Sequence, residues 1–166
     1  MANVTFKGNP VQTAGNLPAK GSAAPDFKLV AGDLSEKSLA DFAGKKKILN
    51  IVHSLDTGTC AISARKFNAA VGDLKNVALL NISADLPFAQ KRFCDSEKLT
   101  HITNLSTFRS HDFGKAYGCL AVAGILTGLN ARAVVVLDEN NKVVHTEQVA
   151  ETTGEPNYDA ALAAVK

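Results

Sequence analysis

Three strand–loop–helix units follow one another in the middle of the chain and limit the folds that it can adopt. The first begins with Ile48–Val52, a short apolar and β-branched run of the kind found in buried strands. The strand and helix patterns of the three units cover residues 48–52 and 59–74, 77–82 and 87–97, and 102–107 and 112–117. Alternating elements of this kind predict a layered α/β domain.

The flanking segments add antiparallel strands to this core. Residues 1–15 predict a small hairpin around Gly8, and residues 26–30 predict a further strand. A helical turn is expected at 38–42, a second hairpin at 132–137 and 142–146, and a terminal helix from 157 to 166. We therefore expect residues 1–166 to form a single domain with a mixed central sheet flanked by helices.

Charge and hydropathy exclude several classes of protein. The formal net charge is +2, and the only basic run is Lys45–Lys47, which is interpreted as a solvated turn rather than a nucleic-acid patch. We see no secretory leader and no apolar stretch of about 18 residues, so a cytoplasmic protein without membrane or nucleic-acid partners is expected. In that compartment thiols stay reduced, and cysteines are more often chemical or buried than structural.

Cys60 is the residue that most clearly suggests chemistry. It lies in the first turn of the predicted helix, where free backbone N–H groups and the helix dipole favour a thiolate. Thr57 stands at or near the N-cap, and its hydroxyl could cap the helix or bond a sulfur or a bound oxygen. A buried, inert cysteine is the alternative, and there is no Cys-x-x-Cys motif.

The other two cysteines differ in their surroundings. Cys94 follows Cys60 by 94 − 60 = 34 positions, and its charged neighbours suggest partial exposure. A disulfide across this span would stabilise the fold by roughly 3–4 kcal/mol, but a transient bond suits a reducing compartment better. Cys119 has apolar neighbours and is expected to be an inert core thiol.

Several long motifs resemble those of bacterial thiol peroxidases, the atypical two-cysteine peroxiredoxins. Residues 54–60 with 65–68 resemble the peroxidatic loop, and residues 83–90 with 92–94 resemble the resolving-cysteine helix. Further matches occur at 105–109, 131–138 and 155–158, so the resemblance covers essentially the whole chain.

The resemblance implies a thioredoxin-like fold with an added N-terminal hairpin, and a role for each of four residues. Cys60 would be the peroxidatic cysteine, Cys94 the resolving cysteine, Thr57 the hydroxyl partner and Arg132 the cationic partner. From the sequence pattern alone, an ordinary strand-edge arginine in a surface ion pair is the preferred interpretation of Arg132. The family reduces alkyl or lipid hydroperoxides and hydrogen peroxide through a sulfenic acid and an intramolecular disulfide. The resemblance also implies a homodimer, thioredoxin as reductant and no bound cofactor.

One position departs from the family pattern Pro-x-x-x-Thr-x-x-Cys. The proline position is occupied by His53, which is larger, titratable and does not fix φ. The change is expected to alter the shape of the pocket, and His53 could instead act as a local cation that lowers the pKa of the thiol. The four histidines show no metal-ligand spacing with the cysteines, so no metal is expected.

The sequence leaves open two alternatives to an enzyme that turns over peroxide. The same thiol chemistry could serve a peroxide-responsive sensor or regulatory partner with little turnover, because His53 replaces the motif proline. The scaffold could also be a binding module that needs neither cysteine. Substrate preference is suggested only by an apolar set that either rims the thiolate or belongs to the core: Leu55, Phe88, Phe93, Leu126 and Leu129.

Overall fold

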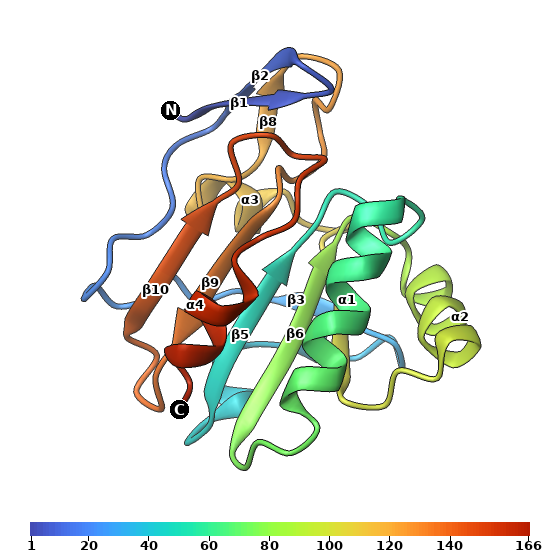
Figure 1. The fold of residues 1–166 in the computed structure, drawn as a ribbon, viewed down its shortest axis with the longest axis vertical. Coiled ribbons are helices and arrows are strands. Elements are labelled where there is room, and N and C mark those ends of the chain that lie inside the picture. Colours follow the sequence, from blue (N-terminus) through green and yellow to red (C-terminus); the bar gives the residue numbers. More distant parts are fainter.

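A seven-stranded mixed sheet forms the centre of the molecule, which is described over residues 1–166 by a computed structural model (Figure 1). The strand order is β10-β9-β5-β6-β7-β3-β4, with β5, β6 and β7 parallel and the other pairs antiparallel. The strands are β3 (Leu29–Ala31), β4 (Glu36–Lys37), β5 (Lys46–Ile51), β6 (Val77–Ser83), β7 (Ile102–Ser106), β9 (Ala133–Leu137) and β10 (Val143–Gln148). The expected mixed α/β sheet is confirmed.

Helices cover both faces of this sheet. The helices are η1 (Leu39–Phe42), α1 (Gly58–Val71), α2 (Pro87–Glu97), α3 (Asp112–Ala116) and α4 (Tyr158–Ala163). Helices α1 and α4 pack on one face, where Ile48, Leu79 and Val134 meet Phe67 and Ala161. None of these helices is long and apolar enough to cross a bilayer.

The opposite face carries the larger apolar cluster. Strand residues such as Leu49, Leu80 and Val135 pack there against Phe113 and Tyr117 of the α3 segment. Strand alternation explains the division, because successive side chains of β5 and β9 point to opposite faces. Residues next to each other in the sequence therefore serve different layers.

The N-terminal hairpin forms a second, smaller sheet. Strands β1 (Asn3–Phe6) and β2 (Asn9–Thr13) pair as expected, and β8 (Ala121–Ala123) joins the edge of β2. A separate apolar cluster lies beneath this sheet, and Leu126 and Leu129 pack in it rather than at a rim near Cys60. The hairpin is thus anchored to the main domain, at the upper end in Figure 1.

Several details differ from the sequence-based expectations. Lys47 is not a solvated turn residue: it lies in β5, fully buried, and its Nζ donates to Asn141 Oδ1 at 2.5 Å. Helix α1 stops at Val71, short of residue 74, because Gly72 and the 72–76 turn interrupt it, and Ile62 points outward. Strands β4 and β8 were not predicted, since two or three residues are too few to show a period.

Gly118 fixes the path of the chain between α3 and β8 and provides a test of the packing. Its φ is +70°, and a Cβ there would overlap the backbone of Asn16. We expect Gly118→Ala to lower the free energy of unfolding by about 3 kcal/mol, as overlap adds to left-handed strain. Gly128→Ala is the matched control: its φ is +92° with open space around it, so about 1 kcal/mol is expected. Equal losses in urea denaturation would contradict the proposed overlap.

Candidate active site

The start of helix α1 presents Cys60 at the C-terminal end of the central strand β5. The helix begins at Gly58, and Thr57 is its extended N-cap residue. The Thr57 hydroxyl does not cap the helix; it donates to the Ser54 carbonyl at 2.9 Å. Asp85 holds the loop from the other side by accepting from Ser54 Oγ at 2.7 Å and from Leu55 N at 2.8 Å. These hydrogen bonds hold the loop between β5 and α1 in place.

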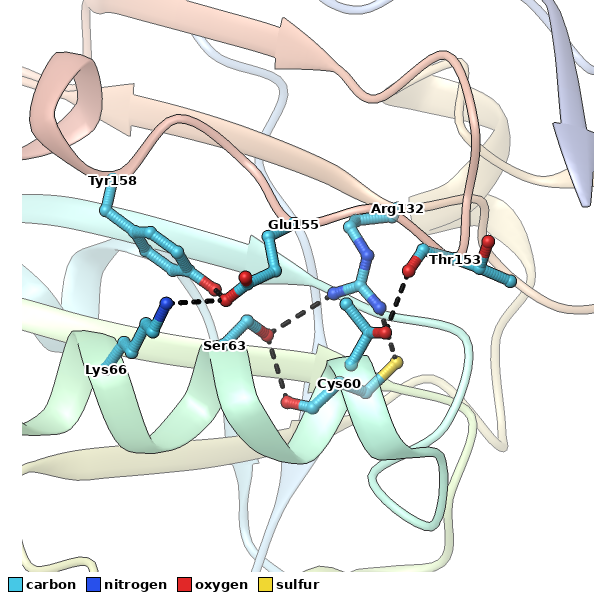
Figure 2. A network of polar contacts seen from close by, with 8 residues as sticks. Cys60, Ser63, Lys66, Arg132, Thr153, Glu155 and Tyr158 are labelled. Carbon is cyan, nitrogen blue, oxygen red and sulfur yellow. Dashed lines mark hydrogen bonds and ion pairs between the residues drawn. The ribbon is translucent and has the colours of Figure 1, made fainter.

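Arg132 lies directly against the sulfur, as Figure 2 shows. Its Nη2 donates to Cys60 Sγ at 3.0 Å, and both residues are fully buried. The remaining guanidinium nitrogens donate to Thr152 O at 3.0 Å and to Ser63 Oγ at 3.3 Å. Alternation along β9 turns Arg132, like Val134, toward the face that α1 covers. Its interpretation as an exposed strand-edge residue is wrong.

His53 contacts the same sulfur from a different side. Its Nδ1 and Nε2 lie 3.6 Å and 3.7 Å from Cys60 Sγ, and the side chain is 4% exposed. The ring of Phe6, from the hairpin, meets the imidazole edge-on at a centroid distance of 5.7 Å. His53 is thus part of the packing around the thiol and does not disrupt it.

These surroundings set the charge of the thiol. Burial alone would raise the pKa of Cys60, because a thiolate is poorly solvated in the interior. The contact with His53 and the positive charge of Arg132 outweigh burial and lower that pKa to about 7. Roughly half of the cysteine is therefore thiolate at neutral pH.

A second layer of polar contacts holds the start and middle of α1 against the C-terminal segment (Figure 2). Thr59 Oγ1 donates to the Thr153 carbonyl at 2.8 Å. Lys66 pairs with Glu155 at 2.9 Å, and Glu155 also accepts from the Tyr158 hydroxyl at 2.8 Å. The segment after β10 therefore closes over the same turn of helix that carries Cys60.

Cys94 lies on helix α2 and is not bonded to Cys60, since all three cysteines are free. The expectation of partial exposure is wrong: Cys94 is 8% exposed, because α2 turns it toward β7. Asn104 Nδ2 donates to its sulfur at 3.0 Å. Burial raises the pKa of Cys94, and the Asn104 contact opposes part of that rise.

A row of three asparagines crosses the sheet between the two cysteines. Asn50, Asn81 and Asn104 are direct neighbours in the parallel register of β5, β6 and β7. Asn50 donates to Asn81 Oδ1 at 2.7 Å and to Ser63 Oγ at 3.3 Å, and Ser63 also accepts from Arg132. The row thus links the surroundings of Cys60 to those of Cys94.

Cys119 belongs to the cluster on the opposite face, as expected of a core thiol. It is fully buried, and burial raises its pKa to about 12. A thiol with so high a pKa supplies almost no thiolate at neutral pH.

Two cavities flank the start of α1, and Thr57 and Gly58 line both. One, of about 280 Å³, lies on the hairpin side and is lined by His53, Phe6 and Thr153 among others. The other, of about 450 Å³, is bounded by Leu55, Phe93 and α2. Phe88, expected with them, is 67% exposed and lines neither cavity.

Sequence reasoning did not find three contributors to the site. Ser63 and Thr152 supply contacts to Arg132, and Asn104 holds Cys94. Ser63 follows Cys60 by three positions, a helical spacing that could have indicated a shared face. The other two are brought in by sheet pairing and a loop, for which the sequence carries no local signal.

Comparison with known proteins shows which family the chain belongs to. Residues 19–162 match the Redoxin family. A thiol peroxidase of Leptospira interrogans serogroup Icterohaemorrhagiae serovar copenhageni is 50% identical over 166 residues, covering 99% of this chain and 97% of that protein.

Two solved structures share the fold throughout. A peroxiredoxin-like protein from Aquifex aeolicus has a TM-score of 0.93 at 39% identity, with 99% of this chain and 96% of the other covered. A thiol peroxidase from Chromobacterium violaceum has a TM-score of 0.89 at 27% identity, with 95% and 91% covered. The chain therefore belongs to the Redoxin family, and within it to the thiol peroxidases, a group of peroxiredoxin enzymes.

Proposed function

We propose that the enzyme reduces organic hydroperoxides and hydrogen peroxide with Cys60, resolves the product with Cys94 and is recycled by thioredoxin. The observation that carries the proposal is the 3.0 Å contact of Arg132 Nη2 with a buried Cys60 sulfur whose pKa is about 7. A fixed cation beside an ionised thiol at a helix start is the environment that a nucleophilic cysteine needs.

The first step is attack of the Cys60 thiolate on the terminal oxygen of the peroxide. The S–O bond forms as the O–O bond breaks, the sulfur is oxidised to a sulfenic acid, and an alcohol or water leaves. Negative charge moves from sulfur to the leaving oxygen. Arg132 and the backbone N–H groups of the α1 start are donors fixed in place before the reaction, so they favour the transition state. Thr57, once its hydroxyl turns from Ser54, is a further donor.

The second step joins two residues from different helices. Cys94 attacks the sulfenic sulfur, and a disulfide forms with release of water. Disulfides need Cα atoms about 4.4–6.8 Å apart, whereas each cysteine is buried within its own helix packing. We therefore propose that the first turn of α1 and the helix α2 loosen together.

Recycling and substrate range complete the proposal. Thioredoxin would reopen the disulfide by thiol–disulfide exchange. Alkyl and lipid hydroperoxides are the proposed substrates, supported by Phe6, Leu55 and Phe93 in the walls of the two cavities. We also propose a homodimer, for which the exposed Leu86 and Phe88 at the start of α2 offer apolar surface.

Steady-state turnover tests the function as a whole. With thioredoxin, thioredoxin reductase and NADPH, we expect rapid consumption of cumene hydroperoxide, abolished in Cys60→Ser. Cys94→Ser should lose turnover but still react once with peroxide, and Cys119→Ser, the matched control, should keep full activity. A single oxidation without turnover in the intact protein would favour the sensor alternative. Faster turnover of hydrogen peroxide than of cumene hydroperoxide would contradict the substrate proposal.

The charge of the thiol gives a pH dependence. Because the pKa of Cys60 is lowered to about 7, the rate of peroxide reaction should fall about tenfold per pH unit below that value. Arg132→Lys removes the guanidinium that donates to Cys60, Ser63 and Thr152 together, and it should raise the pKa of Cys60, which ultraviolet absorbance of the thiolate measures. An unchanged titration in a variant with native circular dichroism would show that Arg132 does not stabilise the thiolate.

Hydrogen exchange tests the proposed loosening. In the disulfide form, amides of residues 58–62 and 87–97 should exchange faster than in the reduced form, while those of β5 and β6 stay protected. Equal protection of both helices in the two forms would mean that the cysteines meet without local unfolding.

A further inference from the structure

His53 is placed to exchange a proton with the reacting sulfur. It lies just beyond the end of β5, buried, with both ring nitrogens within 3.7 Å of Cys60 Sγ. The two distances are nearly equal, so a small rotation of the ring would bring either nitrogen in line with the sulfur. Neither nitrogen has another hydrogen-bond partner. The imidazole is therefore free to take or give a proton.

The same ring also forms part of the wall of the 280 Å³ cavity on the hairpin side. Thr57, Gly58 and Thr59 of the α1 start line this cavity opposite Phe6. A peroxide that entered there would meet the helix start that carries Cys60 and the His53 ring together. His53 thus both lines this cavity and contacts the Cys60 sulfur.

We propose that His53 is a further catalytic residue, a proton shuttle that takes the thiol proton of Cys60 and delivers it to the leaving oxygen of the peroxide. The role rests on the proposed function of Cys60. The imidazole first accepts the proton as the thiolate forms. The thiolate then attacks the terminal oxygen, the O–O bond breaks, and the imidazolium protonates the departing alkoxide. The sulfur is oxidised, the peroxide is reduced to alcohol, and His53 ends neutral, as it began.

The charged groups around His53 fit this role. Cys60 faces it from α1, Arg132 contacts the same sulfur, and Lys7 lines the cavity from the hairpin turn. Glu151, after β10, is occupied with Lys7 N at 2.9 Å and Thr153 Oγ1 at 2.7 Å. No carboxylate contacts the ring, and the Cys60 sulfur is the polar atom that both of its nitrogens approach. A proton that leaves the Cys60 thiol therefore has the imidazole as its nearest side-chain acceptor.

The basicity of the leaving group distinguishes a proton shuttle from a residue that only packs against the sulfur. Sulfenic acid formation would be followed by stopped flow in the intact enzyme, with cumene hydroperoxide and with peracetic acid. Cumene hydroperoxide releases a basic alkoxide that needs a proton, whereas peracetic acid releases acetate, which does not. In His53→Gln we expect the rate with cumene hydroperoxide, corrected for thiolate content, to fall about 10²-fold, and that with peracetic acid to change little.

The pH profile and rescue supply independent readouts. The intact enzyme should show a rate that falls on both the acid and the alkaline side, and His53→Gln should lose the alkaline fall. Added imidazole should restore the cumene hydroperoxide rate in His53→Ala. His111→Gln, a change at an exposed histidine, is the matched control and should behave as the intact enzyme.

Equal losses with both oxidants, or none, would overturn the shuttle, and they would leave the peroxidase proposal standing as long as Cys60→Ser is inactive. Inactivity of the intact enzyme toward both oxidants would instead refute the proposed function. A His53→Gln variant that fails to fold is replaced by His53→Asn, which is expected to show the same selective loss.

Discussion

A buried arginine without a carboxylate partner governs the chemistry of this molecule. Arg132 is fully buried, and no aspartate or glutamate lies within ion-pair distance of it. An uncompensated buried cation is costly, and the only group in contact that can supply a negative charge is Cys60. Carbonyl and hydroxyl acceptors at Thr152 and Ser63 satisfy the other donors but carry no charge. The buried cation therefore favours the same thiolate that the proposed reaction needs as its nucleophile.

Much of the fold could be predicted because its signals are local. The run at 48–52, the helix start at Pro87 and the two hairpins each carry a period or a turn signal that neighbouring residues suffice to reveal. Contacts that arise from pairing between strands could not be predicted in this way. The burial of Lys47 against Asn141, of Cys94 against Asn104 and of Arg132 against Cys60 all join residues far apart in sequence.

The asparagine row places polar side chains of the sheet beneath both cysteine-bearing helices. Strands β5, β6 and β7 present these amides on the face that α1 and α2 cover. Two residues earlier on the same face, β5 and β6 present the apolar Ile48 and Leu79. Polar side chains give less net stabilisation on burial than apolar ones, especially where an atom such as Asn81 Nδ2 lacks a partner. The amides add polar groups beneath the helix surfaces that carry Cys60 and Cys94, whereas the C-terminal half of α1 packs through Phe67 and Val71 on an apolar part of the sheet.

The position of Cys119 determines which products an oxidised cysteine can give. Three thiols allow three internal pairings, and reactivity alone would not restrict them in an unfolded chain. Here the sheet lies between Cys119 and the other two cysteines. A movement of α1 or α2 does not carry a thiol through the hydrogen-bonded strands to the opposite face. Topology thereby disfavours pairing with Cys119, which suits the proposal that Cys94 is the partner of a sulfenic acid at Cys60.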